Sequence, residues 1–532
     1  MTSLTLLEVR RYNVCMHIDI NLRLSPKEAA DISSLEQAAA KKAGIPVRDI
    51  ASVRIIRRSI DARRRPVVVD LIVRLASTED DAPFEAVSYR NVGESKSVIV
   101  VGAGPAGLFA SLRLLELGLK PILLERGTDV HQRKKDLASL VRTGVVNEES
   151  NYSYGEGGAG AFSDGKLYTR ATKRGDVSKI LSQLCQHGAD LDILYDAHPH
   201  IGSNKLPQVI EAIRTTILSH GGEVHFQSKV VALLRKGSVV EGVQTSDGAT
   251  YFGPVVLATG HSARDMYRYL HAEGISIESK AMAMGVRLEH KQHLIDQMQY
   301  KQEEGRGLYL PAAEYSFVHQ VEGRGVYSFC MCPGGFVIPA ATQAGQQVVN
   351  GMSASDRKGE FANSGMVVEL HPEDLPTDKF SGPLGMLEFQ EALERRSFSY
   401  AQQSIKAPAQ RMVDFVKHVR SKDLCESSYI PGLVNADLHA LFPAFISKRL
   451  ALAFEAFGRK ASRFLTNDAL LLASETRTSS PVRIPRDSES RMHPDHAGLF
   501  PCGEGAGYAG GIVSAAMDGV ACAESVKEYL GC

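Results

Sequence analysis

The sequence predicts an α/β protein with a strand-rich α+β second domain and a small α+β module at the N-terminus. An apolar strand, a glycine turn and an amphipathic helix run from residue 97 to 118, strand patterns dominate residues 281–445, and shorter strands alternate before residue 95. At 532 residues the chain also exceeds what one hydrophobic core usually serves, which predicts two or three domains.

The bulk composition argues against several classes of protein. Lys plus Arg and Asp plus Glu both total 61, so the chain as a whole has no excess charge to attract nucleic acid or an anionic membrane. The N-terminal residues lack the basic start and apolar core of a signal peptide, and no run of about 18 apolar residues suggests a membrane span. Eight cysteines without a regular spacing are typical of a reducing compartment. We therefore expect a cytoplasmic protein without a membrane partner.

The first 95 residues are expected to form a ferredoxin-like α+β module. The helix SSLEQAAAKKAG closes at Gly44, and alternating apolar residues predict strands at 4–10, 17–24, 53–60 and 66–75. The polar segment 77–96 reads as the boundary with the next domain.

A cluster of arginines lies on this module, at positions 54, 57, 58 and 63–65. One interpretation is a solvated strand face that nearby acidic residues balance. The other is a patch for RNA or another anionic ligand. The sequence leaves both open.

The pattern GxGxxG occurs at residues 102–107, 155–160 and 505–510, but only the first match has the context of a Rossmann-like dinucleotide-binding turn. It follows the strand SVIVV, opens a helix, and precedes a strand that ends in Glu125 and Arg126. The turn residues have separate tasks: a tight turn, close approach of backbone to a pyrophosphate, and close helix packing. Gly102, Gly104 and Gly107 have these tasks in that order, and Ala106 in the same turn is a further cofactor-binding candidate.

Glu125 is placed to accept hydrogen bonds from the hydroxyls of an adenosine ribose, and its charge would repel the 2′-phosphate of NADP. The other two glycine matches lack a preceding strand and a complete following strand–helix–strand unit. One dinucleotide site is therefore expected, without a separate domain for a nicotinamide cofactor.

With these features the chain resembles the two-domain flavoprotein superfamily that includes glutathione reductase and fumarate reductase. VVLATG at 255–260 and GLFPCGEGAGYAGGIVSAAMDGV at 498–520 look like the second and third FAD-binding segments of that superfamily. The resemblance implies a discontinuous, glutathione-reductase-type FAD-binding domain and non-covalent FAD. The positions that it adds to the FAD site are Val230, Thr259, Gly260, Gly503, Glu504, Gly510, Gly511 and Ile512.

Four of these added positions have a readable chemistry. Glu504 would accept a hydrogen bond from a ribityl hydroxyl, although the superfamily usually has Asp there. Gly510, Gly511 and Ile512 open the last helix, whose N–H groups and dipole can stabilise negative charge on the flavin ring.

Nearly the whole chain also resembles a bacterial family of uncharacterised FAD-dependent dehydrogenases. The resemblance rests on long motifs, among them SYGEGGAGAFSDGKLYTR, GHSARDMY, SFCMCPGG, NGMSASDRKGEFANSG and ETRTSSPVRI. It implies the cofactor and leaves the substrate open.

Three further groups of residues are candidates for the wall around the flavin. The loop 153–166 is rich in glycine, and its matching loop in the superfamily runs beside the flavin ring. Arg477 is a candidate to bind a substrate carboxylate and His261 to move a proton, each weighed against a structural role. The loop candidates are Gly157, Gly158, Gly160, Ser163 and Lys166.

Cys330 and Cys332 in SFCMCPGG lie two residues apart in a predicted strand, which puts both on one face with Met331 opposite. Their Cα atoms would then lie roughly 6.5–7 Å apart, at the limit for an unstrained disulfide. Plain packing and a flavin-facing thiol both remain open, and no motif predicts a metal site.

The sequence thus predicts an N-terminal module at 1–95, an FAD-binding domain at 96–280 and 446–532, and a strand-rich domain at 281–445 that covers the flavin. The expected function is flavin-mediated hydride or electron transfer on a small substrate. The flavin would be reduced by NADH or NADPH as a transient donor, by the substrate itself, or by a protein donor. The alternative is a flavin-containing RNA-associated protein that uses the arginine-bearing module as its adaptor, although nucleic acid is not the expected partner.

Overall fold

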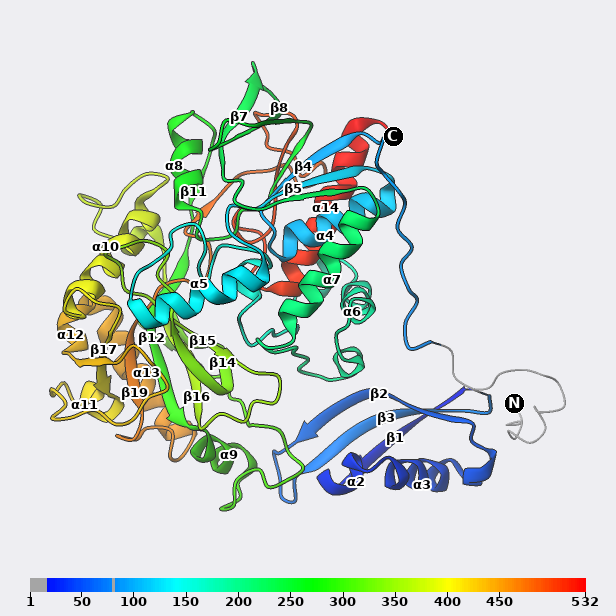
Figure 1. The fold of residues 1–532 in the computed structure, drawn as a ribbon. Coiled ribbons are helices and arrows are strands. Elements are labelled where there is room, and N and C mark those ends of the chain that lie inside the picture. Colours follow the sequence, from blue (N-terminus) through cyan, green and yellow to red (C-terminus); the bar gives the residue numbers. More distant parts are fainter. Residues whose placement is uncertain (1–16, 79–81) are drawn as a thin grey trace.

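The computed structural model describes residues 17–78 and 82–532, so the strand predicted at 4–10 lies outside the described residues. Figure 1 shows a small N-terminal module in blue, and residues 82–96 lead as an extended segment to β4 (Ser97–Val101) in the main body. The main body contains a parallel-sheet domain and a strand-rich domain side by side.

The N-terminal module is a three-stranded antiparallel sheet of order β1-β3-β2, covered by helices. Because β1 and β2 both run antiparallel to the strand between them, they are parallel to each other and joined through a helix. This is the first half of a ferredoxin-like fold; the described part of segment 77–96 contains no further helix or strand that would complete it. The elements are β1 (His17–Leu24), α2 (Pro26–Ala30), α3 (Ile32–Ala43), β2 (Ser52–Asp61) and β3 (Val68–Ala76).

The module contacts the main body through backbone and side chains. The Arg58 guanidinium donates to both Asp196 carboxylate oxygens at 2.6 and 2.8 Å, and its backbone N–H donates to Tyr195 O at 2.9 Å. Val67 is buried in the core of the strand-rich domain. Arg63 is paired with Asp61, so carboxylates neutralise two of the clustered arginines.

The parallel-sheet domain has the strand order β21-β10-β4-β5-β6, and all its neighbouring strands are parallel. Its last strand and last helix come from the C-terminal segment, so the predicted discontinuity of this domain is present. The sheet strands and an attached antiparallel meander are β4, β5 (Lys120–Leu124), β6 (Glu223–His225), β7 (Val230–Lys236), β8 (Val239–Thr245), β9 (Thr250–Phe252), β10 (Val255–Leu257) and β21 (Leu499–Pro501).

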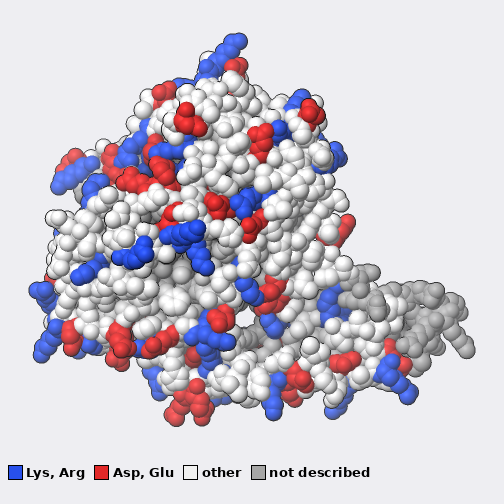
Figure 2. Space-filling model, in the orientation of Figure 1, with Lys and Arg blue, Asp and Glu red and all other residues white. Residues whose placement is uncertain are grey.

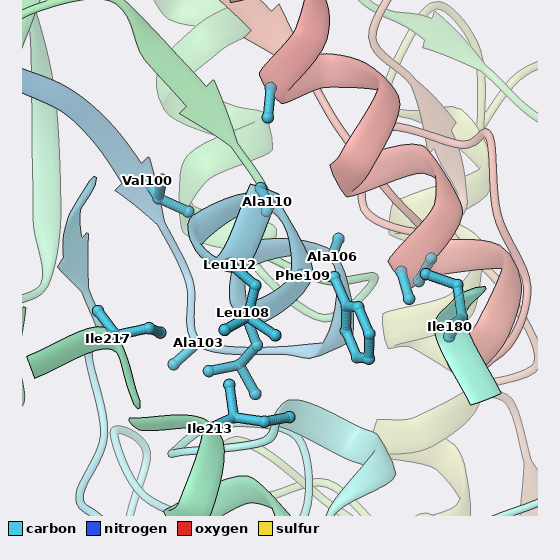
Figure 3. Packing of buried hydrophobic residues seen from close by; sticks show 14 of the residues in the cluster. Val100, Ala103, Ala106, Leu108, Phe109, Ala110, Leu112, Ile180, Ile213 and Ile217 are labelled. Carbon is cyan, nitrogen blue, oxygen red and sulfur yellow. The ribbon is translucent and has the colours of Figure 1, made fainter. Parts of the chain in front are cut away.

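Helix α4 (Pro105–Leu117) lies at the centre of this domain's core (Figure 3). Nine of its 13 residues are buried, because α14 (Ile512–Leu530) packs against it on one side and the sheet on the other. The remaining helices of the domain are α5 (Val130–Thr143), α6 (Val177–Gln186), α7 (Leu206–Ser219) and α8 (Arg264–Ala272).

The strand-rich domain is built on an eight-stranded, largely antiparallel sheet of order β13-β14-β16-β12-β19-β17-β18, with β15 paired to β14. Its strands are β12 (Met282–Lys291), β13 (Val318–Val321), β14 (Arg324–Pro339), β15 (Val349–Ser353), β16 (Phe361–Leu370), β17 (Ala407–Arg411), β18 (Leu433–Asn435) and β19 (Leu470–Glu475). Its helices are α9 (Gln292–Tyr300), α10 (Gly385–Tyr400), α11 (Met412–Val416), α12 (Leu438–Leu441) and α13 (Ala444–Lys460).

The expected boundary at residue 446 is corrected by this sheet. Strand β19 pairs with β12 and β17, and α13 is buried in the same core, so the chain returns to the parallel-sheet domain only after β19. The two crossings between the domains pair with each other as β11 (Glu278–Ser279) and β20 (Val482–Arg483). A strand's partners depend on tertiary pairing, which local sequence does not show.

No helix within residues 17–78 and 82–532 has the length and apolar character that crossing a membrane requires. On the face in Figure 2 basic and acidic side chains are interspersed over the main body and the module alike.

Candidate functional site

A cavity of about 380 Å³ lies where the parallel-sheet and strand-rich domains meet. This volume is within the usual range for small-molecule sites. It is lined by all three segments that the sequence assigns to a dinucleotide and by strands β14 and β15 of the strand-rich domain. The predicted residues that line it are Gly102, Gly104, Ala106, Glu125, Arg126, Gly158, Gly160, Ser163, Lys166, Val230, Thr259, Gly260, His261, Cys330, Arg477, Glu504, Gly510, Gly511 and Ile512.

Four predicted site residues do not line the cavity. A Cβ at Gly107 would lie 1.9 Å from Gly102 O, and one at Gly503 would lie 2.8 Å from the Cβ of Ala106. A Cβ at Gly157 would come similarly close to a side chain of α7. Cys332 is fully buried. These three glycines therefore allow close packing behind the wall of the cavity.

The turn before α4 has the form that a phosphate site needs. Gly102 has φ +105°, and a Cβ there would lie 2.5 Å from Ala258 O, so only glycine fits. Gly104 is the N-cap of α4 and has no side chain to occupy the space beyond the first N–H groups. Those N–H groups have no partner inside the helix and are a ready anion site.

Glu125 connects this turn to the loops around it. Its carboxylate accepts hydrogen bonds of 2.9 Å from the backbone N–H groups of Ala103, Gly127 and Gly155. A carboxylate offers about four acceptor positions, so one remains for the predicted ribose hydroxyl. Glu125 thus holds the backbone of the surrounding loops in place and also lines the cavity.

Next to Val230, the wall of the cavity contains a network of charged side chains that the sequence did not predict. Arg126 lies over the ring of Tyr154, with 4.1 Å between guanidinium carbon and ring centroid. The same guanidinium and Lys229 both bind Asp265, each at 3.0 Å. Arg126 is consequently held by neighbours from three segments, which no local motif reveals.

The residues at the start of α14, Gly510, Gly511 and Ile512, line the cavity, and Glu504 lies in its wall. A 19-residue helix presents the positive end of its dipole there. Burial raises the pKa of Glu504 to about 7 against the opposing charge of Lys280. This carboxyl can therefore exchange a proton near neutral pH.

Arg477 is held inside the protein rather than free to bind a substrate carboxylate, which corrects the predicted role. Its guanidinium donates to Glu394 Oε1 at 2.8 Å and Oε2 at 3.1 Å, to Ser262 Oγ at 2.7 Å and to Thr342 Oγ1 at 3.1 Å. Arg264 binds Glu394 as well, at 2.7 Å. Burial works against the charge of Glu394, but the two guanidiniums hold its pKa at about 2.

His261 lies beside this cluster in the cavity wall. Burial and the charges of Arg477 and Arg264 lower its pKa to about 4. One ring nitrogen, Nδ1, lies 2.8 Å from Ser262 Oγ. The imidazole is therefore neutral at physiological pH.

Cys330 and Cys332 do not lie in a regular strand. Between Phe329 and Cys332 the register of β14 against β16 shifts by one residue, and Cys330 has φ +44°. This bulge turns Cys330 toward the cavity, where it is exposed, while Cys332 is fully buried. The expected flat strand is therefore replaced by a bulge, in which one thiol reaches the cavity and the other lies buried behind it.

One group of metal-ligating atoms occurs among the described residues: Cys502, Asp518 and Cys522, within 4.8 Å of one another. Arg486 donates to the two Asp518 oxygens at 2.6 and 2.9 Å and to Cys522 Sγ at 3.5 Å. The positively charged guanidinium of Arg486 thus already occupies the place that a metal ion would take.

Comparisons with known families identify the class of protein. A family described as "FAD binding domain" matches residues 95–250, and one described as "FAD-dependent protein, C-terminal domain-like" matches residues 281–478. A domain of unknown function matches residues 16–76. The chain is accordingly a FAD-dependent oxidoreductase, with a FAD-binding domain and a strand-rich second domain.

A protein of Clostridium beijerinckii, described as uncharacterized, is 40% identical over 531 residues, which covers 96% of this chain and 98% of the relative. The chain belongs to the same family as this Clostridium protein.

Three solved structures are similar at low identity. CtdE in complex with FAD and a substrate is 12% identical, with 82% of each chain covered and a TM-score of 0.34. Tetracycline destructase Tet(51) is 11% identical, with 82% of each chain covered and a TM-score of 0.33. The open conformation of a flavocytochrome c3 fumarate reductase is 14% identical, covers 85% of this chain and 83% of the other, and has a TM-score of 0.32. Scores this low carry no argument about the substrate.

Proposed function

We propose that this chain is a dehydrogenase or reductase of the glutathione-reductase type, which binds FAD non-covalently in the cavity and acts on a small molecule at the strand-rich side. One observation carries the proposal: the three dinucleotide-type segments and the strand-rich domain line a single cavity. When bound, FAD supplies hydride or electron transfer.

The residues present fit this cofactor. The N–H groups after Gly104 suit its pyrophosphate, the remaining acceptor position of Glu125 suits its ribose, and the start of α14 suits negative charge on the ring. The N–H groups at the start of α14 and the carboxyl of Glu504 lie in the same wall. A Cβ at Gly104 would come no closer than 3.9 Å to the neighbouring loop, so the glycine leaves open space toward the cavity.

The groups able to hold a proton in the cavity are few. Glu504 is poised near neutral pH, whereas His261 is uncharged and can only accept a proton or donate its single ring N–H. Arg477 positions Ser262 beside His261 through its bond to the hydroxyl. We therefore assign Glu504 the proton-exchanging role and Arg477 a positioning role.

The test is an anaerobic absorbance titration of the purified protein. We expect a bound flavin whose long-wavelength band is bleached by NADH, NADPH, a reduced carrier protein or a reducing metabolite, and the donor that bleaches it defines the reaction. Bound flavin that none of these donors reduces would contradict the proposed reaction.

The alternative, an RNA-associated protein, has no support in the family matches, and Arg58 and Arg63 of its predicted adaptor are occupied by carboxylates. RNA that copurifies in a salt-dependent way and is lost on changing Arg63, Arg64 and Arg65 would favour it instead.

A further inference from the structure

We propose that Cys330 and Cys332 form a reactive dithiol centre in the cavity wall, in which Cys330 attacks a sulfur of a small disulfide and Cys332 resolves the product. This activity goes beyond the flavin reaction and does not depend on it.

The backbone around Cys330 presents the thiol to the cavity. A residue with a side chain and φ +44° is uncommon, and holding it there costs about 1–3 kcal/mol. The register shift on each side of Cys332 confines the distortion to this short stretch of β14. A strand needs no such bulge for packing alone, whereas the bulge is what brings the Cys330 thiol into the cavity beside Cys332.

The two cysteines are linked directly, since the Cys332 thiol donates to the backbone oxygen of Cys330 at 3.5 Å. Arg287, which is fully buried, donates from Nη2 to Cys332 Sγ at 3.2 Å and to Cys330 O at 2.7 Å. Its partner Glu475 lies 3.4 Å away and is equally buried. The charge of this guanidinium favours the ionised form of both thiols, although only the Cys332 sulfur is in direct contact with it.

The charges around the pair fix which thiol ionises. The hydrogen bond from Cys332, working against burial and joined by the charges of Arg287 and Lys166, lowers the pKa of Cys330 to about 6. The same hydrogen bond and burial raise the pKa of Cys332. Asp164 opposes ionisation of both thiols, and Glu475 and Glu504 also interact electrostatically with Cys330. Cys330 is also the thiol that lines the cavity, so it is the one that an incoming disulfide meets.

The proposed exchange balances in two steps. The Cys330 thiolate attacks one sulfur of the small disulfide, whose S–S bond breaks to release one thiolate. Cys332 then loses its proton and attacks the Cys330 sulfur of the mixed disulfide, which forms the Cys330–Cys332 bond and releases the second thiol. Two electrons pass from the protein to the small disulfide, and the two thiol protons end on its products.

The experiment treats the reduced, full-length, FAD-containing protein with 2-hydroxyethyl disulfide and maps the products by intact and peptide mass. We expect the wild type to become two hydrogen masses lighter, with a Cys330–Cys332 crosslink. The Cys332→Ser variant should instead retain one probe fragment on Cys330, and Cys330→Ser should form neither product. Cys425→Ser, which removes a partly exposed cysteine elsewhere in the same domain, should react as the wild type does.

A second measurement covers the case in which a variant fails to fold. In the wild type, iodoacetamide should label Cys330 at least about tenfold faster than Cys425 at pH 6, with half-maximal rate near that pH. Labelling of Cys330 no faster than Cys425, or a probe adduct that forms elsewhere in Cys332→Ser, would overturn the dithiol. FAD content measured on the same samples keeps this outcome separate from the proposed function.

Discussion

Arg477 and Glu504 show how burial decides the roles of single side chains in this cavity. Arg477 was expected from a local pattern and Glu504 from the family resemblance, and both lie in the wall. Sequence indicated where they fall along the chain but not what faces them. Glu394, which occupies most of the Arg477 guanidinium, comes from α10, more than eighty residues away in the chain. No local signal links the two.

Replacing Arg477 by Met should strongly destabilise the protein, because Glu394 would keep only Arg264 as a direct cationic partner. Breaking a buried ion pair from one side costs about 3–5 kcal/mol. Urea unfolding followed by far-UV circular dichroism measures the change. Arg395→Met is the matched control, since that arginine is 57% exposed and lies 3.5 Å from Glu391, and it should cost at most about 1 kcal/mol. Equal shifts for the two variants would refute the assignment of Arg477.

In the FAD-free protein, Glu504 should affect how the free energy of unfolding depends on pH. Its folded pKa of about 7 lies above the ordinary value of 4.5, so between these values the folded state binds a proton that the unfolded state has lost. The free energy of unfolding should therefore fall as pH rises from 4.5 to 7. Glu504→Gln should reduce this slope by the equivalent of up to one bound proton. Urea unfolding across this pH range measures the change. Glu528→Gln, at an exposed position on α14, should leave the slope unchanged, and a slope that Glu504→Gln also leaves unchanged would contradict the buried carboxyl.

At the scale of elements, the sequence predicted best where a motif is local. The strand, turn and helix of residues 97–117 are contiguous, and the structure places them as expected. The bulge in β14 was missed because a register shift depends on the facing strand. The same reason explains β19, whose apolar run fits either domain until its neighbours β12 and β17 are known.

The turn into α4 tolerates no side chain at Gly107. A Cβ there would lie 1.9 Å from Gly102 O, so Gly107→Ala must move the helix away from the strand. We expect a loss of about 3 kcal/mol in stability and weaker FAD binding, measured by thermal unfolding and by retained flavin absorbance. Gly93→Ala is the control, because its Cβ would meet nothing closer than 3.7 Å. Normal stability and flavin content in Gly107→Ala would contradict the packing described for this turn.

At the scale of the whole molecule, the N-terminal module has few contacts with the body, whereas buried ion pairs such as Arg264–Glu394 and Arg357–Asp164 join the two large domains. The N-terminal module meets the body through Arg58, Asp196 and Val67, and the two large domains exchange chain only through β11 and β20. The cavity lies between the large domains and does not include the module.

The module should therefore separate without loss of the cavity. Val67→Asp places a charge in the core of the strand-rich domain, which should release the module. Hydrogen exchange should rise in β2 and around residues 195–197, while exchange around α4 and the flavin content stay as in the wild type. Loss of flavin on this change would show instead that the module supports the cavity.

The central claim is that the three separated segments and the strand-rich domain hold one FAD. The direct measurement is the amount of FAD released on acid precipitation of the purified protein, per chain, after incubation with excess FAD and removal of the unbound cofactor. The structure predicts one FAD per chain, released intact because it is not covalently bound. A chain that retains none under these conditions would contradict the account.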